Sequence, residues 1–243
     1  MLAPWYREHG RHELPWRASR DRWTVLVSEV MLHQTQVPRV AAVFDAFIAE
    51  FPTPAATAAA GPAAVITAWG SLGYPRRARR LWESSVLITR DGWPADLSEL
   101  PGVGRYTAAA VAAQVDDDDR VGIEVNIRRV CERVRGTRLS DVEAESCVRE
   151  IATGLPPRDR LLAMMDLGAT VCTARAVVRS LPDRVALRDA RHPRRRNEAP
   201  AGTLRRIVPS APGDRDGAAT RRSGRRGRAR RKGARVVARR RAR

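Results

Sequence analysis

Apolar residues recur along the first 175 positions with the spacing of helices, and no segment alternates as a β-strand does. The clearest case is a stripe at i, i+3, i+4, i+7 and i+8 formed by Trp23, Leu26, Val27, Val30 and Met31. This spacing is typical of a helix with one buried face. Further helices are expected at residues 40–51, 55–60, 63–70, 75–90, 106–115, 125–135, 141–153 and 157–168. The pattern predicts an all-α protein.

Breaks between these segments fall where helix breakers stand. Gly61-Pro62, Gly92-Trp93-Pro94 and Pro156-Pro157 interrupt the helical pattern, and an acidic run occupies 116–119. Pro38 fits the first turn of a helix that continues through 40–51.

No apolar run reaches the length of about 18 residues that a membrane span needs. The first residues lack the apolar core of a secretion signal, so a cytoplasmic protein with no membrane contact is expected.

The positive charge is concentrated at the carboxyl end. Residues 191–243 carry 20 of the 45 Lys and Arg residues and three of the 27 Asp and Glu residues, which leaves 25 basic and 24 acidic side chains in 1–190. A segment so rich in Arg, Ala, Gly and Pro, without an apolar period, is expected to be disordered. Such a tail binds nucleic acid without reading its sequence, so it says little about a specific function.

Glu29 stands beside the apolar stripe. A carboxyl group that is partly removed from water has a raised pKa and can hold a proton near neutral pH, as a general acid must. The alternative is that Glu29 is an ordinary glutamate on the surface of a helix. The residues around it decide between these interpretations.

A second segment, Leu100–Ala108, contains Pro101-Gly102-Val103-Gly104 directly before an expected helix. Proline fixes one backbone angle, and the glycines permit positive φ and the close approach of another chain. A turn that leads into a helix presents free N–H groups and the positive end of the helix dipole, which suit a DNA phosphate. The alternative is a tight turn between helices that binds nothing.

Six segments in order resemble the adenine DNA glycosylases of the MutY type, within the helix-hairpin-helix superfamily that includes endonuclease III. Together with the Leu100–Ala108 hairpin they cover roughly residues 5–175. The segments are Leu14–Arg17, Ser28–Gln36, Trp69–Tyr74, Arg77–Arg79, Asn126–Val130 and Met165–Ala169. The resemblance implies two helical lobes with an active-site cleft between them, a monomer, and double-stranded DNA with a mispaired adenine as the partner.

The resemblance also implies roles for individual residues. Glu29 would protonate the flipped adenine at N7 and later handle the attacking water, and Glu124, where the family has aspartate, would stabilise the oxocarbenium-like sugar. One extra methylene displaces that charge by about 1.5 Å, enough to affect the rate. Catalytic roles are expected for Glu29, Glu124, Tyr106 and Asn126, and DNA contacts for Leu32, Gln34, Gly102, Val103, Gly104 and Arg105. His33 replaces the glutamine usual in its segment.

The scarcity of lysine restricts which reactions this chain can catalyse. Lys232 is the sole lysine and stands in the expected tail, so residues 1–190 offer no lysine amine for a Schiff base. Endonuclease III-type enzymes with lyase activity carry lysine where this chain has Tyr106. The expected reaction is therefore base excision without efficient strand cleavage.

The family's iron–sulfur site is incomplete. The family binds a [4Fe-4S] cluster through four cysteines spaced x6, x2 and x5. Cys172 holds the first position, and Arg179, Pro182 and Arg188 hold the others, so no cluster and no other cofactor is expected for this chain. Cys131 and Cys147 are expected to be ordinary buried residues.

The coding frame offers one explanation for the missing cysteines. Val178, Leu181 and Leu187 directly precede the three positions that lack the family's cysteine. If their codons are GTG or CTG and the next codon begins with C, then the sequence one base later is TGC, a cysteine codon. Residues after about 175 would then be a frameshifted translation. The alternative is a lineage that lost its cluster and gained a basic tail.

The expected domain organisation is a catalytic domain over 1–175, a degenerate iron–sulfur region over 176–190 and the basic tail over 191–243. Nothing after 190 has the pattern of the family's second domain, which recognises 8-oxoguanine, so selectivity for that partner over guanine should be weak. Removal of thymine or uracil opposite guanine is an alternative function, although Gln34-Thr35-Gln36 favours adenine. A non-catalytic DNA-binding protein is an alternative of another class.

Overall fold

The computed structural model describes residues 2–174, and within this range the regular structure is helical, with no β-strand. The expectations for residues 176–190 and 191–243 lie outside the described residues. The α-helices are α1 Leu2–His9, α2 Arg22–Leu32, α3 Val37–Glu50, α4 Pro54–Trp69, α5 Pro75–Asp91, α6 Arg105–Val115, α7 Val125–Arg135, α8 Asp141–Ile151 and α9 Pro157–Asp166. Short 3₁₀ turns span Pro15–Arg17, Gly70–Leu72 and Leu97–Glu99, and a π-helical turn spans Leu167–Val171.

The expected helices are confirmed, with small shifts at their ends. The apolar stripe of α2 is buried as predicted, and the side chain of Asp21 caps the helix by accepting from the N–H of Thr24 at 2.8 Å. The two segments expected at 55–60 and 63–70 form one element, α4, whose Gly61 has the non-helical angles φ 80° and ψ 163°. The predicted break is therefore present as a bend.

Two hydrophobic cores organise the described residues. The first contains the large side chains of α2, α3 and α4, among them Trp23, Phe47 and Trp69. The second gathers α7, α8 and α9 around residues such as Ile127 and Met164. The two-lobed all-α architecture expected from the sequence is confirmed.

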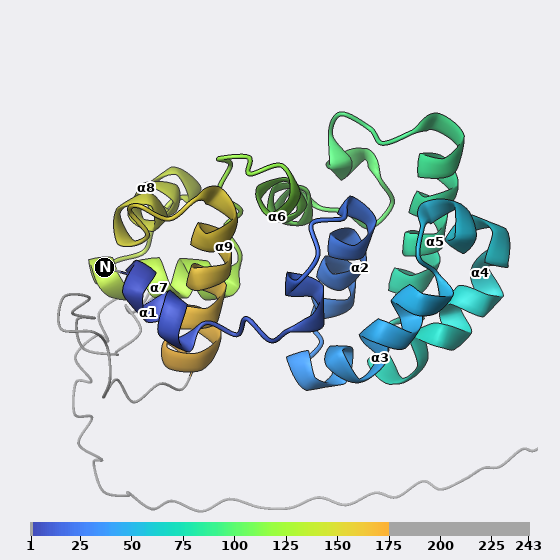
Figure 1. The fold of residues 1–243 in the computed structure, drawn as a ribbon. Coiled ribbons are helices and arrows are strands. Elements are labelled where there is room, and N and C mark those ends of the chain that lie inside the picture. Colours follow the sequence, from blue (N-terminus) through green and yellow to red (C-terminus); the bar gives the residue numbers. More distant parts are fainter. Residues whose placement is uncertain (1, 175–243) are drawn as a thin grey trace, which may run out of the picture. The chain divides into compact units, whose positions relative to one another are not determined.

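Helix α6 joins the two cores. Ala108 and Val111 belong to the first core, while Ala110 and Ala113 belong to the second. Figure 1 shows α6 between α2 and α9, and it packs against both. Because small alanine side chains let the helices approach closely, α6 is the element through which residues of α2 and α9 can reach a common site.

The amino-terminal helix α1 was not expected from the sequence. Its Leu2 and Tyr6 are buried in the second core, and α1 packs against α9 (Figure 1). The chain thus begins in the second lobe, forms the first lobe from α2 to α5 and returns through α6. This crossing places the segment 11–17 beside α9.

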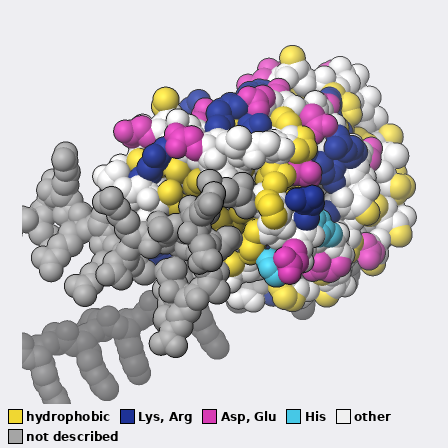
Figure 2. All heavy atoms as spheres, turned by 60° about the vertical axis from the view of Figure 1, so that its left-hand side comes forward, with side chains coloured by type: hydrophobic (Ala, Val, Ile, Leu, Met, Phe, Trp, Pro, Cys, Tyr) yellow, Lys and Arg dark blue, Asp and Glu magenta, His cyan; other side chains and the backbone are white. Residues whose placement is uncertain are grey.

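Acidic and basic side chains are interspersed on the face shown in Figure 2, in keeping with the nearly balanced charge of residues 1–190. None of the described helices is long and apolar enough to cross a lipid bilayer.

Candidate active site

A cavity of about 170 Å³ is lined by residues from both cores. Helices α2, α6, α7 and α9 and the segment 11–17 all contribute to its walls. Four of the residues predicted from the sequence line it: Glu29, Leu32, Tyr106 and Asn126. The other predicted site residues lie outside its lining.

Glu29 is the buried acid of this cavity, with 9% of its surface exposed. Gln114 donates to it, from Nε2 to Oε1 at 2.7 Å. Burial raises the pKa of Glu29 to about 7; the Gln114 hydrogen bond and the charge of Arg17 lower that pKa, and the charge of Glu124 raises it. A carboxyl group with this pKa exists in both protonation states near neutral pH, as a general acid and base must.

Gln114 was not identified from the sequence. It is 1% exposed, and its carbonyl oxygen accepts from Nη1 of Arg158 at 2.9 Å. Arg158 also donates to the carbonyl oxygens of Arg17 and Ser19. The only signal in the sequence is a single polar residue in the apolar run of α6.

Asp166 is a second functional candidate that the sequence did not reveal as such. It is fully buried and receives two hydrogen bonds from Arg17, one from the Arg11 side chain and one from the Arg11 backbone, at 2.7–2.9 Å. Burial acts to raise the pKa of Asp166, but the hydrogen bonds and charges of Arg17 and Arg11 outweigh it and hold that pKa below its ordinary value. Asp166 thereby fixes two arginines of the cavity wall.

Tyr106 lies at the start of α6, and its hydroxyl donates to Sδ of Met165 at 3.5 Å. Burial, helped by the charges of Glu29 and Glu124, raises its pKa well above the ordinary value, so the phenol stays protonated. Its ring packs close to Gly122, where an added Cβ would lie 2.9 Å from Cδ2. The predicted site residue is therefore in the cavity wall and held in place.

Glu124 takes the N-cap position of α7. Its Oε1 accepts from the N–H groups of Asn126 and Ile127 at 2.7 and 2.9 Å, and its Oε2 accepts from the Asn126 amide at 3.0 Å. It is not among the residues that line the cavity, although its charge acts on Glu29 and Tyr106. The glutamate thus caps its own helix and is hydrogen-bonded to Asn126, which does line the cavity.

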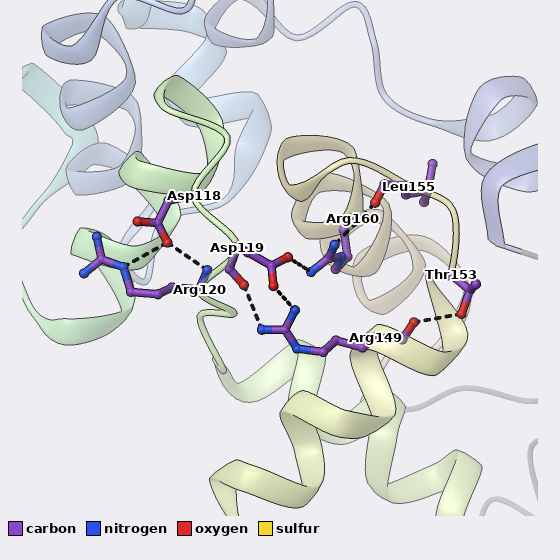
Figure 3. Close-up of polar contacts among 7 residues, drawn as sticks. All are labelled: Asp118, Asp119, Arg120, Arg149, Thr153, Leu155 and Arg160. Carbon is purple, nitrogen blue, oxygen red and sulfur yellow. Dashed lines mark hydrogen bonds and ion pairs between the residues drawn. The ribbon is translucent and has the colours of Figure 1, made fainter.

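The loop before Glu124 is tied to α8 and α9 by ion pairs (Figure 3). The carboxylate of Asp119 accepts from Arg149 and, at 2.6 Å, from Arg160, while Arg149 also donates to the Asp119 carbonyl oxygen at 2.9 Å. These pairs lie beside a larger, open hollow of about 660 Å³. Since Asp118 and Asp119 already have arginine partners there, we place the candidate site in the smaller cavity around Glu29.

The end of α2 carries the residues expected to contact DNA beside the target base. Leu32 lines the cavity, whereas Gln34 is exposed and has a positive φ of 53°. His33 Nε2 shares a hydrogen bond of 2.9 Å with Oγ1 of Thr107, so this side chain joins α2 to α6. Burial, and secondarily the charge of Arg77, lowers the pKa of His33, which favours its neutral form.

The glycine hairpin is formed, but its two glycines differ. Gly102 has a φ of 80°, and an added Cβ would lie 2.9 Å from Cδ of Arg80. Gly104 has φ −92° and ψ 172°, so Gly102 is the one of these two glycines that uses a positive φ. Gly104 is instead the N-cap of α6 and offers no side-chain cap, and there is open space where its Cβ would be. The first N–H groups of α6 are thus accessible to an anion.

The residues at the family's iron–sulfur position do not fit a cluster. Cys172 is fully buried, and Nη1 of Arg133 lies 3.2 Å from its Sγ. Arg129 and Arg133 donate to the carbonyl oxygens of Gly168, Cys172 and Thr173. Arg179, Pro182 and Arg188, which lie outside the described residues, supply no thiolate, and four are needed. Cys131 and Cys147 are buried, as expected.

Comparison with known proteins assigns this architecture to a family. The model of the HhH-GPD superfamily base excision DNA repair proteins matches residues 27–153. An adenine DNA glycosylase of Mycolicibacterium smegmatis is 43% identical over 221 residues, which cover 85% of this chain and 72% of that protein. A thymine/uracil-DNA glycosylase of Pyrobaculum aerophilum is 34% identical over 191 residues, 72% of this chain and 83% of that protein.

A solved structure agrees with these relationships. The structure of a thermostable thymine-DNA glycosylase superposes with a TM-score of 0.63 at 26% identity and covers 72% of this chain and 85% of that one. The resemblance found in the sequence motifs is thus confirmed in family and in fold. The chain belongs to the HhH-GPD superfamily of base excision DNA repair proteins, and it is a DNA glycosylase, an enzyme that cleaves N-glycosidic bonds in DNA.

Proposed function

We propose that this glycosylase removes adenine mispaired with 8-oxoguanine or guanine. The observation that carries the proposal is Glu29, a buried carboxyl in the cavity wall with a pKa raised to about 7. The greater identity to an adenine DNA glycosylase, 43% against 34% for the thymine/uracil enzyme, supports adenine as the base. Glu29 suits a purine, because N7 of adenine is a basic nitrogen that an acid of this pKa can protonate.

The reaction begins when the target nucleotide leaves the duplex and its base enters the cavity. Glu29 transfers its proton to N7, and the C1′–N9 bond then breaks with its electron pair moving to the protonated base. The sugar becomes an oxocarbenium-like cation. Water adds to C1′, and its proton passes to the Glu29 carboxylate, which restores the acid.

Glu124 stabilises the cationic sugar by its negative charge. Its three hydrogen bonds from Asn126 and Ile127 hold the carboxylate in one place, as electrostatic stabilisation of a developing charge requires. Asn126 and Tyr106, both in the cavity wall, position the nucleotide. Nε of Arg17 is buried and has no partner within the described residues, and a ring nitrogen of the bound base would accept from it.

DNA is held by groups around this cavity. The hairpin 102–105 binds the phosphate backbone through N–H groups at the start of α6, and Leu32 and Gln34 occupy the gap that the flipped base leaves. The enzyme is proposed to act as a monomer in the cytoplasm.

Strand cleavage is not part of the proposed reaction. An enzyme that cleaves the strand at an abasic site through a Schiff base needs an amine, and residues 1–190 contain no lysine. The product is therefore an intact strand with an abasic site.

A single-turnover assay on a duplex with adenine opposite 8-oxoguanine, followed by alkali to cut abasic sites, tests this function. We expect base release by the wild type, no strand cleavage before alkali, and loss of release in Glu29→Gln, which keeps the shape and the Gln114 contact but has no proton to give. Binding of the duplex without release by the wild type would contradict the proposal and favour a non-catalytic DNA-binding protein.

Removal of thymine or uracil opposite guanine is the second candidate, favoured by the 34% identity to the thymine/uracil enzyme. A panel of duplexes that differ only in the mispair separates the two. Release of thymine or uracil, with adenine left intact, would replace the adenine proposal.

A further inference from the structure

Arg77 of α5 caps the carboxyl end of α2, the helix that carries Glu29. Its Nη1 donates to the carbonyl oxygens of Val30 and Met31, both at 3.1 Å, and to that of His33. These are terminal carbonyl groups of the helix, whose partial negative charge favours a cation. One guanidinium therefore determines where α2 ends and how the chain leaves it.

The same guanidinium holds the turn before α5. Its Nη2 donates to the carbonyl oxygens of Leu72 and Gly73 at 3.2 and 3.3 Å, and to Oγ1 of Thr35 at 2.9 Å. The central guanidinium carbon, Cζ, lies 5.6 Å from the centre of a Trp69 ring and 5.2 Å from the centre of the Tyr74 ring, within the range of cation–π attraction. Arg77 thus joins two turns that are about 40 residues apart in the sequence.

Each of these turns contains a strained, exposed residue. Gln34 has a φ of 53° and Tyr74 a φ of 50°, and they are two of the three non-glycine residues with positive φ in the part of the chain that the structure describes. Tyr74 is 61% exposed, and Gln34 is exposed as well. Strained backbone of this kind persists where surrounding contacts fix it, and it gathers at functional sites. Here Arg77 supplies contacts to both turns.

We infer that Arg77 is a positioning residue that holds Gln34 and Tyr74 in a fixed relation, so that together they separate the target base from its partner when the nucleotide is extruded. This inference rests on the proposed function. Arg77 does not line the cavity, whereas Thr35, to which it is bonded, does. Its action is therefore on entry of the base into the cavity and not on the proton transfer from Glu29.

Lysine cannot replace arginine in this role. The guanidinium reaches six oxygen acceptors from two nitrogens, and its Cζ is within cation–π range of two aromatic rings. An ammonium group has three donors around one nitrogen. Arg77→Lys therefore keeps the charge and loses the link between the turns. Arg79→Lys is a matched control, because Arg79 is on the same helix and pairs with Glu83 on the exposed surface.

The test follows extrusion directly in full-length protein that carries Glu29→Gln, so that no base is released. The duplex has 2-aminopurine, which fluoresces when unstacked, at the target position opposite 8-oxoguanine. We expect a fluorescence rise in the Glu29→Gln parent and in the Arg79→Lys variant of it. In the Arg77→Lys variant the fluorescence should rise about tenfold more slowly, which is the effect of losing one or two hydrogen bonds. The affinity of this variant for matched duplex should be within about twofold of that of the parent.

Two further variants truncate the exposed side chains of Gln34 and Tyr74, which are not part of a hydrophobic core, so folding is expected to be unaffected. Gln34→Ala and Tyr74→Ala, each in the Glu29→Gln parent, should slow the rise in the same way and leave the melting temperature unchanged. An equally fast rise in Arg77→Lys, or in both truncations, would overturn the role of Arg77 and leave the proposed function intact. Absence of a rise in the parent would instead contradict adenine extrusion, and with it the proposed function.

Discussion

Gln114 on α6 donates a hydrogen bond of 2.7 Å to Glu29 on α2, across 85 positions of the chain. Both side chains are buried, and the carboxylate is the acceptor of the amide N–H. A donor of this kind favours the ionised form of the acid, whereas burial favours the protonated form. The balance of these two effects leaves the pKa of Glu29 at about 7.

Gln114→Met should move the alkaline limb of the pH–rate profile upward. The substitution removes the donor that stabilises the Glu29 carboxylate, while the volume stays similar, so the pKa of Glu29 rises and the acid stays protonated to higher pH. Single-turnover rates of base release between pH 5 and 9 measure this. An alkaline limb at the same pH as in the wild type would show that Gln114 does not set the protonation of Glu29.

Glu29 should also make stability depend on pH. Its pKa in the folded protein, about 7, exceeds the ordinary value of 4.5, so the folded state holds the proton more tightly than the unfolded state does. The resulting contribution to stability is fully present below about pH 4.5 and is lost as the pH rises through 7. Glu29→Gln should therefore gain stability relative to wild type over this interval, by up to about 3 kcal/mol.

Urea denaturation of both proteins at pH 5, 6, 7 and 8 measures that difference. We expect the stability of Glu29→Gln relative to wild type to increase from pH 5 and to level off above pH 7. Asp45→Asn, on the exposed surface of α3, is the control and should show no such trend. A difference that is constant with pH would contradict the raised pKa.

Glu124→Asp should increase the rate of base release. Aspartate is a preferred N-cap residue and keeps the contacts to the start of α7, and its shorter side chain restores the charge position that the family uses. An increase of about tenfold is expected, since a shift of about 1 Å can change a rate by one to two orders of magnitude. Glu124→Gln, which lacks the charge, should lower the rate, and equal rates in all three proteins would remove Glu124 from the reaction.

The sequence predicted Glu29 from two signals: the apolar stripe of α2 shows locally that this carboxyl group is near a buried face, and the order of the family motifs distinguishes it from an ordinary surface glutamate. It also predicted the bend of α4, since Gly61-Pro62 breaks a helix wherever it occurs. In both cases the physical cause lies within a few residues of the feature. Family motifs added Tyr106 and Asn126, which the structure places in the cavity wall.

Gln114, Asp166 and α1 were missed because their causes are distant in the sequence. In the sequence Gln114 is a single polar residue on an alanine-rich helix, and its contact with Glu29 exists only once α2 packs against α6. The role of Asp166 depends on its hydrogen bonds from Arg17 and Arg11, which lie 149 and 155 positions earlier in the sequence. The eight residues of α1 are too few to form a stable helix alone, and it is burial of Leu2 and Tyr6 against α9 that orders them.

The purified enzyme should be active without iron. Cys172 is the one thiol at the family's four cluster positions, and the segment that a cluster would fix is held by Arg129 and Arg133 through carbonyl oxygens of residues 168–173. Iron analysis should therefore find far less than four atoms per chain, and Cys172→Ser should keep the rate of base release. Arg133→Met should lower the melting temperature, because it removes one of the two arginine side chains of α7 that hold that segment. Four iron atoms per chain would contradict this account, and the codons for Val178, Leu181 and Leu187 would then be the place to seek the missing cysteines.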